Sequence, residues 1–78
     1  MKEKVLSIMY EITEGIYSRE ELISIDYEKE RVLDSLQIVE LVVELESAFD
    51  IEIADEDLSI DNLKSFEKIV LLVQKLIK

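Results

Sequence analysis

The chain has 78 residues, with no cysteine, no histidine, no proline and one glycine. This length suits one small domain, and the composition excludes disulfide bonds, cysteine-based metal sites and catalysis by a histidine base. The net charge of −10 disfavours binding to nucleic acid or anionic membranes and favours basic protein surfaces as partners.

No stretch of the sequence resembles a membrane span or a secretory signal. The longest apolar run, Ile69 to Val73, is far shorter than the ~20 residues that cross a bilayer. The N-terminal stretch MKEKVLSIMYEITE carries three glutamates and lacks the apolar core of a signal peptide. We therefore expect a soluble, cytoplasmic monomer that does not insert into membranes and forms a single domain over residues 1–78.

The first predicted element is an amphipathic helix over residues 2–14, which Gly15 is suited to end. Its apolar residues recur at helical spacing: Val5, Ile8, Met9, Ile12 and Ile16. The connection over residues 17–33 is long for a link between two helices, so we expect that these helices do not simply run back on each other. Ser18 and Glu21 match a capping box and predict a short helical turn. The apolar residues expected to reach partly into the core are Leu22, Ile23, Ile25, Tyr27 and Leu33.

The second main helix is predicted from Asp34 to Phe49. Asp34 can cap it, and Gln37 can close a capping box. Ser35 follows the cap in the first turn, where an attached anion would meet the positive end of the helix dipole. The expected apolar stripe comprises Ile38, Leu41, Val42, Leu45, Ala48 and Phe49, and the opposite face carries Glu40, Glu44 and Ser47.

The C-terminal part predicts two more helices. Ile51 and Ile53 are expected to hold the following loop, Ser59 to Leu63 to form a short helix, and Ser65 to cap the last one. The last helix should bury Phe66, Ile69, Val70, Val73, Leu76 and Ile77, and expose Lys64, Lys68, Lys75 and Lys78. The sum is an all-α fold: a small four-helix bundle of three main helices and one short helix, with a long loop between helices one and two.

The negative charge is concentrated in one part of the chain. Residues 34–61 contain ten acids and no lysine or arginine, whereas the remaining residues contain nine acids and nine bases. A charge run is usually a solvated face, but the lack of any compensating base over this length favours docking to basic partner surfaces.

Two kinds of chemistry are excluded by what surrounds the candidate residues. Ser35 as a catalytic nucleophile lacks a histidine base and a G-x-S-x-G elbow. Asp55, Asp57 and Ser59 alternate like the start of a calcium loop, but Ile60 and Phe66 stand where glycine and a bidentate glutamate are required. We expect no catalytic residue and no specific metal site, which leaves open only weak divalent-ion binding by the clustered carboxylates.

The span DSLQIVELVVELESAFDIEIADED resembles acyl carrier proteins and the related peptidyl and D-alanyl carrier domains. The matching residues are Asp34-Ser35-Leu36, Val39-Glu40-Leu41, Leu45-Glu46, Phe49, Ile51-Glu52-Ile53 and Asp55-Glu56-Asp57. In that family the serine of Asp-Ser-Leu carries 4′-phosphopantetheine, whose terminal thiol holds the cargo as a thioester. The resemblance therefore implies that Ser35, flanked by Asp34 and Leu36, is the attachment residue.

The resemblance also implies partners and the surface that meets them. The partners would be a phosphopantetheinyl transferase, a loading ligase or acyltransferase, and other pathway enzymes with basic patches. Leu36, Val43 and Ile53 with Ala54 would form an apolar contact beside the cofactor. The acids expected to bind partners are Glu40, Glu44, Glu46, Glu52, Asp55, Glu56 and Asp57.

The function implied is that of a stand-alone acyl carrier, not an enzyme, in a fatty-acid-like or specialised biosynthetic pathway. Fatty-acid carriers usually have glycine at the position of Val32, an acid at Gln37 and often proline at Ala54. The run Leu33-Asp34-Ser35 looks closer to discrete D-alanyl or aminoacyl carriers and to stand-alone carriers of specialised pathways. A D-alanyl or other aminoacyl carrier loaded by an adenylating ligase is therefore the first alternative. Two others remain: an unmodified acidic helical adaptor for a basic partner, and a degenerate carrier fold kept as a structural subunit.

Overall fold

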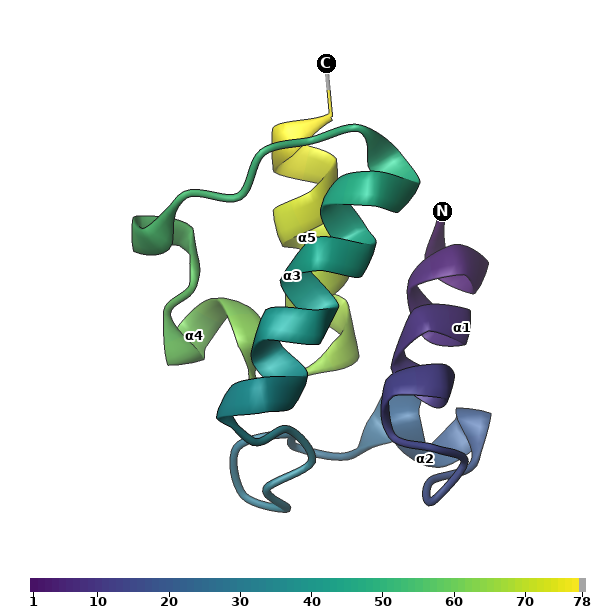
Figure 1. Ribbon diagram of the computed structural model, residues 1–78. Helices are drawn as coiled ribbons and strands as arrows, with labels where there is room; N and C mark the ends of the chain where they lie inside the picture. Colours follow the sequence, from purple (N-terminus) through teal and green to yellow (C-terminus); the bar gives the residue numbers. More distant parts are fainter. Residues whose placement is uncertain (78) are drawn as a thin grey trace.

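The computed structural model describes residues 1–77, apart from the side chain of Ile60. Over these residues the chain forms, in order, α1 (Lys2–Ile12), α2 (Arg19–Ser24), α3 (Ser35–Phe49), the 3₁₀ turn η1 (Asp55–Asp57), α4 (Ile60–Leu63) and α5 (Phe66–Leu76). In Figure 1, α1 runs downward, while α3 and α5 both run upward. The N-terminus and the end of α5 therefore lie at the end of the bundle opposite to the start of α3. The small helical bundle expected from the sequence is confirmed.

Four of the helices begin with the side-chain caps that the sequence predicts. The caps of α2, α3, α4 and α5 each accept a hydrogen bond from the backbone N–H three residues further on; they are Ser18, Asp34, Ser59 and Ser65. A cap satisfies one of the free N–H groups at a helix start and stabilises the helix by about 1 kcal/mol. Because both partners lie within one turn, a cap can be predicted from the local sequence.

The first helix ends two residues earlier than predicted. The hydroxyl of Thr13 donates to the carbonyl of Met9 at 2.8 Å, and Glu14 and Gly15 have left-handed backbones with φ of 55° and 72°. These two residues turn the chain away from the helix axis. Ile16, which was expected to continue the apolar stripe, is 74% exposed instead, so that prediction is wrong.

The long loop predicted between the first two main helices contains α2 and a buried tyrosine. Tyr27 donates its hydroxyl hydrogen to the carbonyl of Leu22, and its own N–H donates to the carbonyl of Lys64 at 2.6 Å. Burial raises the pKa of Tyr27 above its usual range, because a phenolate would lose its solvation. Ile25 and Leu33 are half-buried as expected, but Ile23 is exposed.

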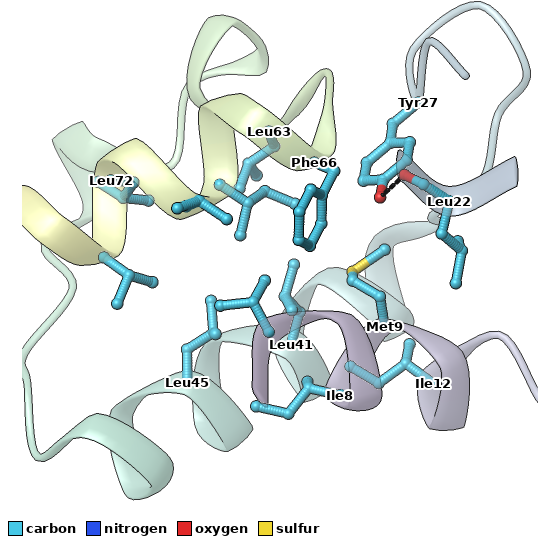
Figure 2. Close-up of a cluster of buried hydrophobic side chains, with 14 of the residues drawn as sticks. Ile8, Met9, Ile12, Leu22, Tyr27, Leu41, Leu45, Leu63, Phe66 and Leu72 are labelled. Carbon is cyan, nitrogen blue, oxygen red and sulfur yellow. Dashed lines mark hydrogen bonds between the residues drawn. The ribbon is translucent and has the colours of Figure 1, made fainter. Parts of the chain in front are cut away.

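Side chains from α1, α3 and α5 meet in one core, with Leu22 and Tyr27 closing one end (Figure 2). Burying a side chain of this size contributes about 1.5–3 kcal/mol. The expected core residues Ile8, Ile12, Leu41, Leu45, Val70 and Val73 are buried, and Phe49 is half-buried. Leu72 is also buried, which the sequence reading missed, whereas Ile77 is exposed.

The lysines of the C-terminal part were all expected to face water. Lys68 and Lys75 are exposed, Lys64 is half-buried, and Lys78 lies outside the described residues. Within residues 1–77 there is no helix that is both long and apolar enough to span a bilayer. The helix that matters for the site, α3, contacts α1 along its length and leaves its N-terminal end open to solvent.

Candidate functional site

The start of α3 is held by a reciprocal pair of hydrogen bonds. The carboxylate of Asp34 accepts from the N–H of Gln37 at 2.8 Å, and the N–H of Asp34 donates to Oε1 of Gln37 at 3.0 Å. This is the capping box that the sequence predicts. It fixes the backbone on both sides of Ser35 and Leu36.

Ser35 is the first residue of α3 and is exposed. At α2, α4 and α5 a serine is itself the cap, so its hydroxyl oxygen is occupied by a backbone N–H. At α3 the cap is Asp34, one residue earlier, and the Ser35 hydroxyl is left for other partners. The backbone N–H groups of the first turn point outward here, as they do at any helix start.

The electrostatics of this turn also differ from those of the other helices in residues 1–77. The first turns of α1, α2, α4 and α5 each contain an acid after the cap, but the first turn of α3 contains none. Gln37 stands where a capping box often has glutamate. A negative group bound at Ser35 would meet the positive end of the helix dipole, and the acid next to it is the cap Asp34, whose carboxylate accepts the N–H of Gln37.

Comparison with known proteins identifies the family. A family model described as "Phosphopantetheine attachment site" matches residues 32–70, half of the chain. A D-alanyl carrier protein of Lactococcus lactis subsp. cremoris is 35% identical over 75 residues, which cover 96% of this chain and 94% of that protein. An acyl carrier protein homolog of Mycoplasmopsis pulmonis is 36% identical over 75 residues, covering 96% and 93%. The chain belongs to the acyl carrier protein family.

A third relative, the D-alanyl carrier protein of Abiotrophia defectiva, is 32% identical over 75 residues that cover 96% of this chain and 94% of that protein. No solved structure gave a significant match. The prosthetic group of the carrier family is covalently attached 4′-phosphopantetheine. The start of α3 fits this group, because it combines an exposed hydroxyl, outward N–H groups and an acid-free first turn.

Exposed apolar side chains follow Ser35 along one side of α3. Leu36 is 67% exposed and Val43 is 56% exposed, as expected. Val39, which lies between them, is 58% exposed. Val39 was not included in the apolar contact predicted from the sequence, although its spacing from Leu36 and Val43 places it on their face. Beside this row, α1 and α3 enclose a groove of about 430 Å³ whose lining includes Val39 and Val43.

The acids predicted to bind partners fall into two groups. Five are exposed and form no ion pair within residues 1–77; we call them the acidic surface, and they are Glu40, Glu44, Glu52, Asp55 and Glu56. The carboxylate of Glu46 instead accepts the N–H of Ile53 at 2.9 Å, and Asp57 pairs with Lys75 at 3.5 Å. Ile53 itself is half-buried. Glu46 and Asp57 therefore have structural contacts that the sequence did not reveal.

Glu11 is a residue that the sequence reading missed. It lies on α1, outside the acidic run of residues 34–61, and lines the groove together with Glu40 and Glu44. Ile8 and Ile12 supply the apolar floor. In the sequence, Glu11 is marked only by its position on the face of α1 next to Ile8 and Ile12. This position becomes informative once α3 is known to pack against that face.

Proposed function

We propose that the protein is an acyl or aminoacyl carrier whose 4′-phosphopantetheine is attached to the Ser35 hydroxyl. The observation that carries this proposal is the placement of an exposed serine at the first helical position, directly after an aspartate that supplies the cap. When bound, the cofactor supplies a terminal thiol that holds the cargo as a thioester. The chain itself contributes no catalytic residue.

The residues of the chain then have separate tasks. Asp34 caps α3 and keeps its first turn formed, and the helix dipole stabilises the phosphodiester next to it. Leu36, Val39 and Val43 offer an apolar contact, and the acidic surface attracts the basic surfaces of enzymes. Exposed charges mainly raise the rate of association, which suits a carrier that must leave each enzyme after one step.

The partners in this proposal are a phosphopantetheinyl transferase, a loading enzyme and the enzymes that use the cargo. That the protein acts as a single carrier domain, as a monomer and in the cytoplasm stays a prediction. Size-exclusion chromatography can test the monomeric state.

The decisive experiment is incubation of the purified protein with a broad-specificity phosphopantetheinyl transferase and coenzyme A, followed by intact-protein mass spectrometry. The wild type should gain the mass of one phosphopantetheinyl group, and Ser35→Ala should gain none. Ser47→Ala, at an exposed position near the other end of α3, is the matched control and should be modified like the wild type. A wild type without adduct, or an equal adduct on Ser35→Ala, contradicts the proposal and favours an unmodified acidic adaptor.

A small aminoacyl cargo such as D-alanine is the second candidate. It is favoured by the relatives named D-alanyl carrier proteins and by the small size of the hollow beside the start of α3. That hollow measures about 110 Å³ and is lined by Leu33, Ile38, Leu58 and Leu63 among others. It is much smaller than the groove of about 430 Å³ between α1 and α3, which favours a small cargo over a long acyl chain at this position.

Loading assays with the modified protein separate the two cargo classes. An adenylating ligase specific for D-alanine should form an aminoacyl thioester on the modified wild type if this candidate is right. A panel of amino acids and short acyl groups, offered with their ligases, gives the comparison. Loading by acyl ligases alone would exclude the aminoacyl candidate and leave the carrier function in place.

A further inference from the structure

The side-chain amide of Gln37 makes two hydrogen bonds in opposite senses. Its Oε1 accepts from the N–H of Asp34 at 3.0 Å, which is one half of the capping box. Its Nε2 donates to the carbonyl of Ile12 at 3.2 Å, across 25 residues of sequence. We call this pair of bonds the Gln37 bridge, because it joins the start of α3 to the end of α1.

The Ile12 carbonyl needs such a donor. It belongs to the last turn of α1, whose carbonyls have no partner inside the helix. The N–H groups that follow donate elsewhere, that of Glu14 to the Glu11 carbonyl and that of Gly15 to the Tyr10 carbonyl. A glutamate at position 37 could close the capping box but, when ionised, could not donate to a carbonyl. The structure therefore gives a reason for an amide at this position.

The bridge is the side-chain hydrogen bond that ties the first turn of α3 to α1. Ser35 and Leu36 are both exposed, whereas Gln37 is half-buried against α1. Val32 and Ile38, on either side of these residues, pack in the core, and the bridge adds a hydrogen bond to α1 between them. Helix ends open easily when few contacts hold them, so loss of this bond should loosen the turn. Transfer of a group to a hydroxyl requires that the hydroxyl be presented in a narrow range of directions.

We propose that Gln37 is a positioning residue for the modification of Ser35. The Gln37 bridge fixes the first turn of α3 against α1, and thereby fixes the direction in which the Ser35 hydroxyl meets a phosphopantetheinyl transferase. This inference rests on the proposed attachment at Ser35. It gives a role to the identity of Gln37, which is otherwise notable only because fatty-acid carriers usually have an acid at this position.

Melting temperatures as a function of pH test the bond itself. Gln37→Glu keeps the acceptor and loses the donor, and Gln37→Met loses both at similar length. Gln74→Glu, at an exposed position of α5, controls for the added negative charge. Near pH 7, Gln37→Glu and Gln37→Met should melt about 4–8 °C below the wild type. Gln74→Glu places its charge in the last turn of α5, at the unfavourable end of that helix dipole, and should still lose less than either Gln37 variant.

Acidification distinguishes the two Gln37 variants. Once protonated, near the ordinary carboxyl pKa of about 4.3, the introduced group can again donate to the Ile12 carbonyl. The melting deficit of Gln37→Glu should then shrink between pH 7 and pH 4, while that of Gln37→Met should not. The other acids near the bridge are the same in every variant, so differences from the wild type isolate the new group; they are Glu11 on α1, Glu14 after it, the cap Asp34 and Glu40 on α3. Equal pH profiles for both variants would overturn the bridge.

The kinetics of modification test the positioning role. At a temperature where all variants are folded, Gln37→Met should lower the kcat of pantetheine transfer about two- to tenfold, with KM within about twofold of the wild type. Gln74→Glu should change neither. A Gln37→Met protein that melts early but is modified at the wild-type kcat would show that Gln37 only stabilises the fold. If the wild type accepts no pantetheine at all, the positioning role fails with the attachment, while the melting profiles still decide whether the bridge exists.

Discussion

At the start of α3, the order of Asp34 and Ser35 gives the capping role to the aspartate and leaves the serine hydroxyl free of it. Asp34 occupies the cap and Ser35 the first helical position, so the carboxylate forms the hydrogen bond that a serine forms at α2, α4 and α5. The hydroxyl of Ser35 is thereby available without cost to the helix. With the two residues reversed, the serine would be occupied as a cap and an acid would stand in the first turn.

Tyr27 provides a prediction about alkaline pH. Its pKa is raised in the folded state by burial, so the folded protein favours the neutral phenol. The stabilisation is complete below the ordinary pKa of about 10 and is lost as the pH rises above it. We expect Tyr27→Phe to lower the free energy of unfolding by about 0.5–1.5 kcal/mol at neutral pH, because the hydrogen bond to Leu22 is lost.

Urea unfolding measured from pH 7 to pH 11 checks this expectation. The wild type should lose stability above about pH 10, and Tyr27→Phe should lose much less. Tyr10→Phe, which changes a half-buried ring on α1, should keep the wild-type dependence. If Tyr27→Phe also kept the wild-type pH dependence, a group other than Tyr27 would be responsible for the loss of stability at alkaline pH.

At the scale of elements, the helix starts were predictable and several contacts between elements were not. Each cap depends on residues three positions apart, so local sequence decides it. Ile16 was wrongly placed, because the periodicity of α1 was extended past the point where Glu14 and Gly15 turn the chain. Ile23 was wrongly expected to reach the core, because α2 buries its neighbour Leu22 and leaves Ile23 exposed. The sequence reading also missed η1, a short 3₁₀ turn without a side-chain cap.

In the candidate site, too, local features could be predicted from the sequence and contacts between distant residues could not. The positions of Asp34, Ser35, Leu36 and Val43 could be predicted, because a helix start and an exposed helix face are local patterns. The Gln37 bond to Ile12 spans 25 residues, and the Lys75 bond to Asp57 spans 18. Such pairs exist only once the helices are packed, so no spacing rule could reveal them.

Glu46 and Glu44 lie two residues apart on α3 and should behave differently. Glu46 holds the loop after α3 through the N–H of Ile53, whereas Glu44 is exposed. We expect Glu46→Ala to lower the free energy of unfolding by about 1–3 kcal/mol, because a partly buried N–H loses its partner. Glu44→Ala should stay within about 0.5 kcal/mol of the wild type.

Urea titrations of both variants measure this difference. Glu46→Gln serves as a control, because its amide oxygen can still accept the same hydrogen bond. An equal stability of Glu46→Ala and Glu44→Ala would mean that the Glu46 bond contributes nothing in solution.

For the whole molecule, the important property is the separation of charge. The acidic surface lies on α3 and the segment that follows it, whereas the bases lie outside residues 34–61. Two faces of α3 have different roles. Leu41 and Leu45 are buried in the core and stabilise the fold, while Glu40 and Glu44 face solvent and belong to the acidic surface. A charge change on the outer face can therefore alter recognition without altering the fold.

Glu40→Lys tests recognition by this surface. We expect slower transfer of pantetheine from a transferase at low salt, through a lower kcat/KM, with an unchanged far-UV circular dichroism spectrum. The difference from the wild type should diminish as salt screens the charges. Glu20→Lys makes the same charge change at an exposed position of α2 and should have a much smaller effect. Equal effects of the two substitutions would point to net charge alone.

The two ends of α3 are held in different ways. The first turn has the capping box and the bond to Ile12, which tie it to α1. The helix ends at Asp50, whose left-handed backbone (φ of 53°) donates its N–H to the Glu46 carbonyl, and the Glu46 carboxylate accepts the N–H of Ile53. Hydrogen bonds therefore fix the helix at both ends. For a swinging arm attached at Ser35, the point of attachment is then a fixed pivot, and the reach of the cargo is set by the arm rather than by motion of the helix.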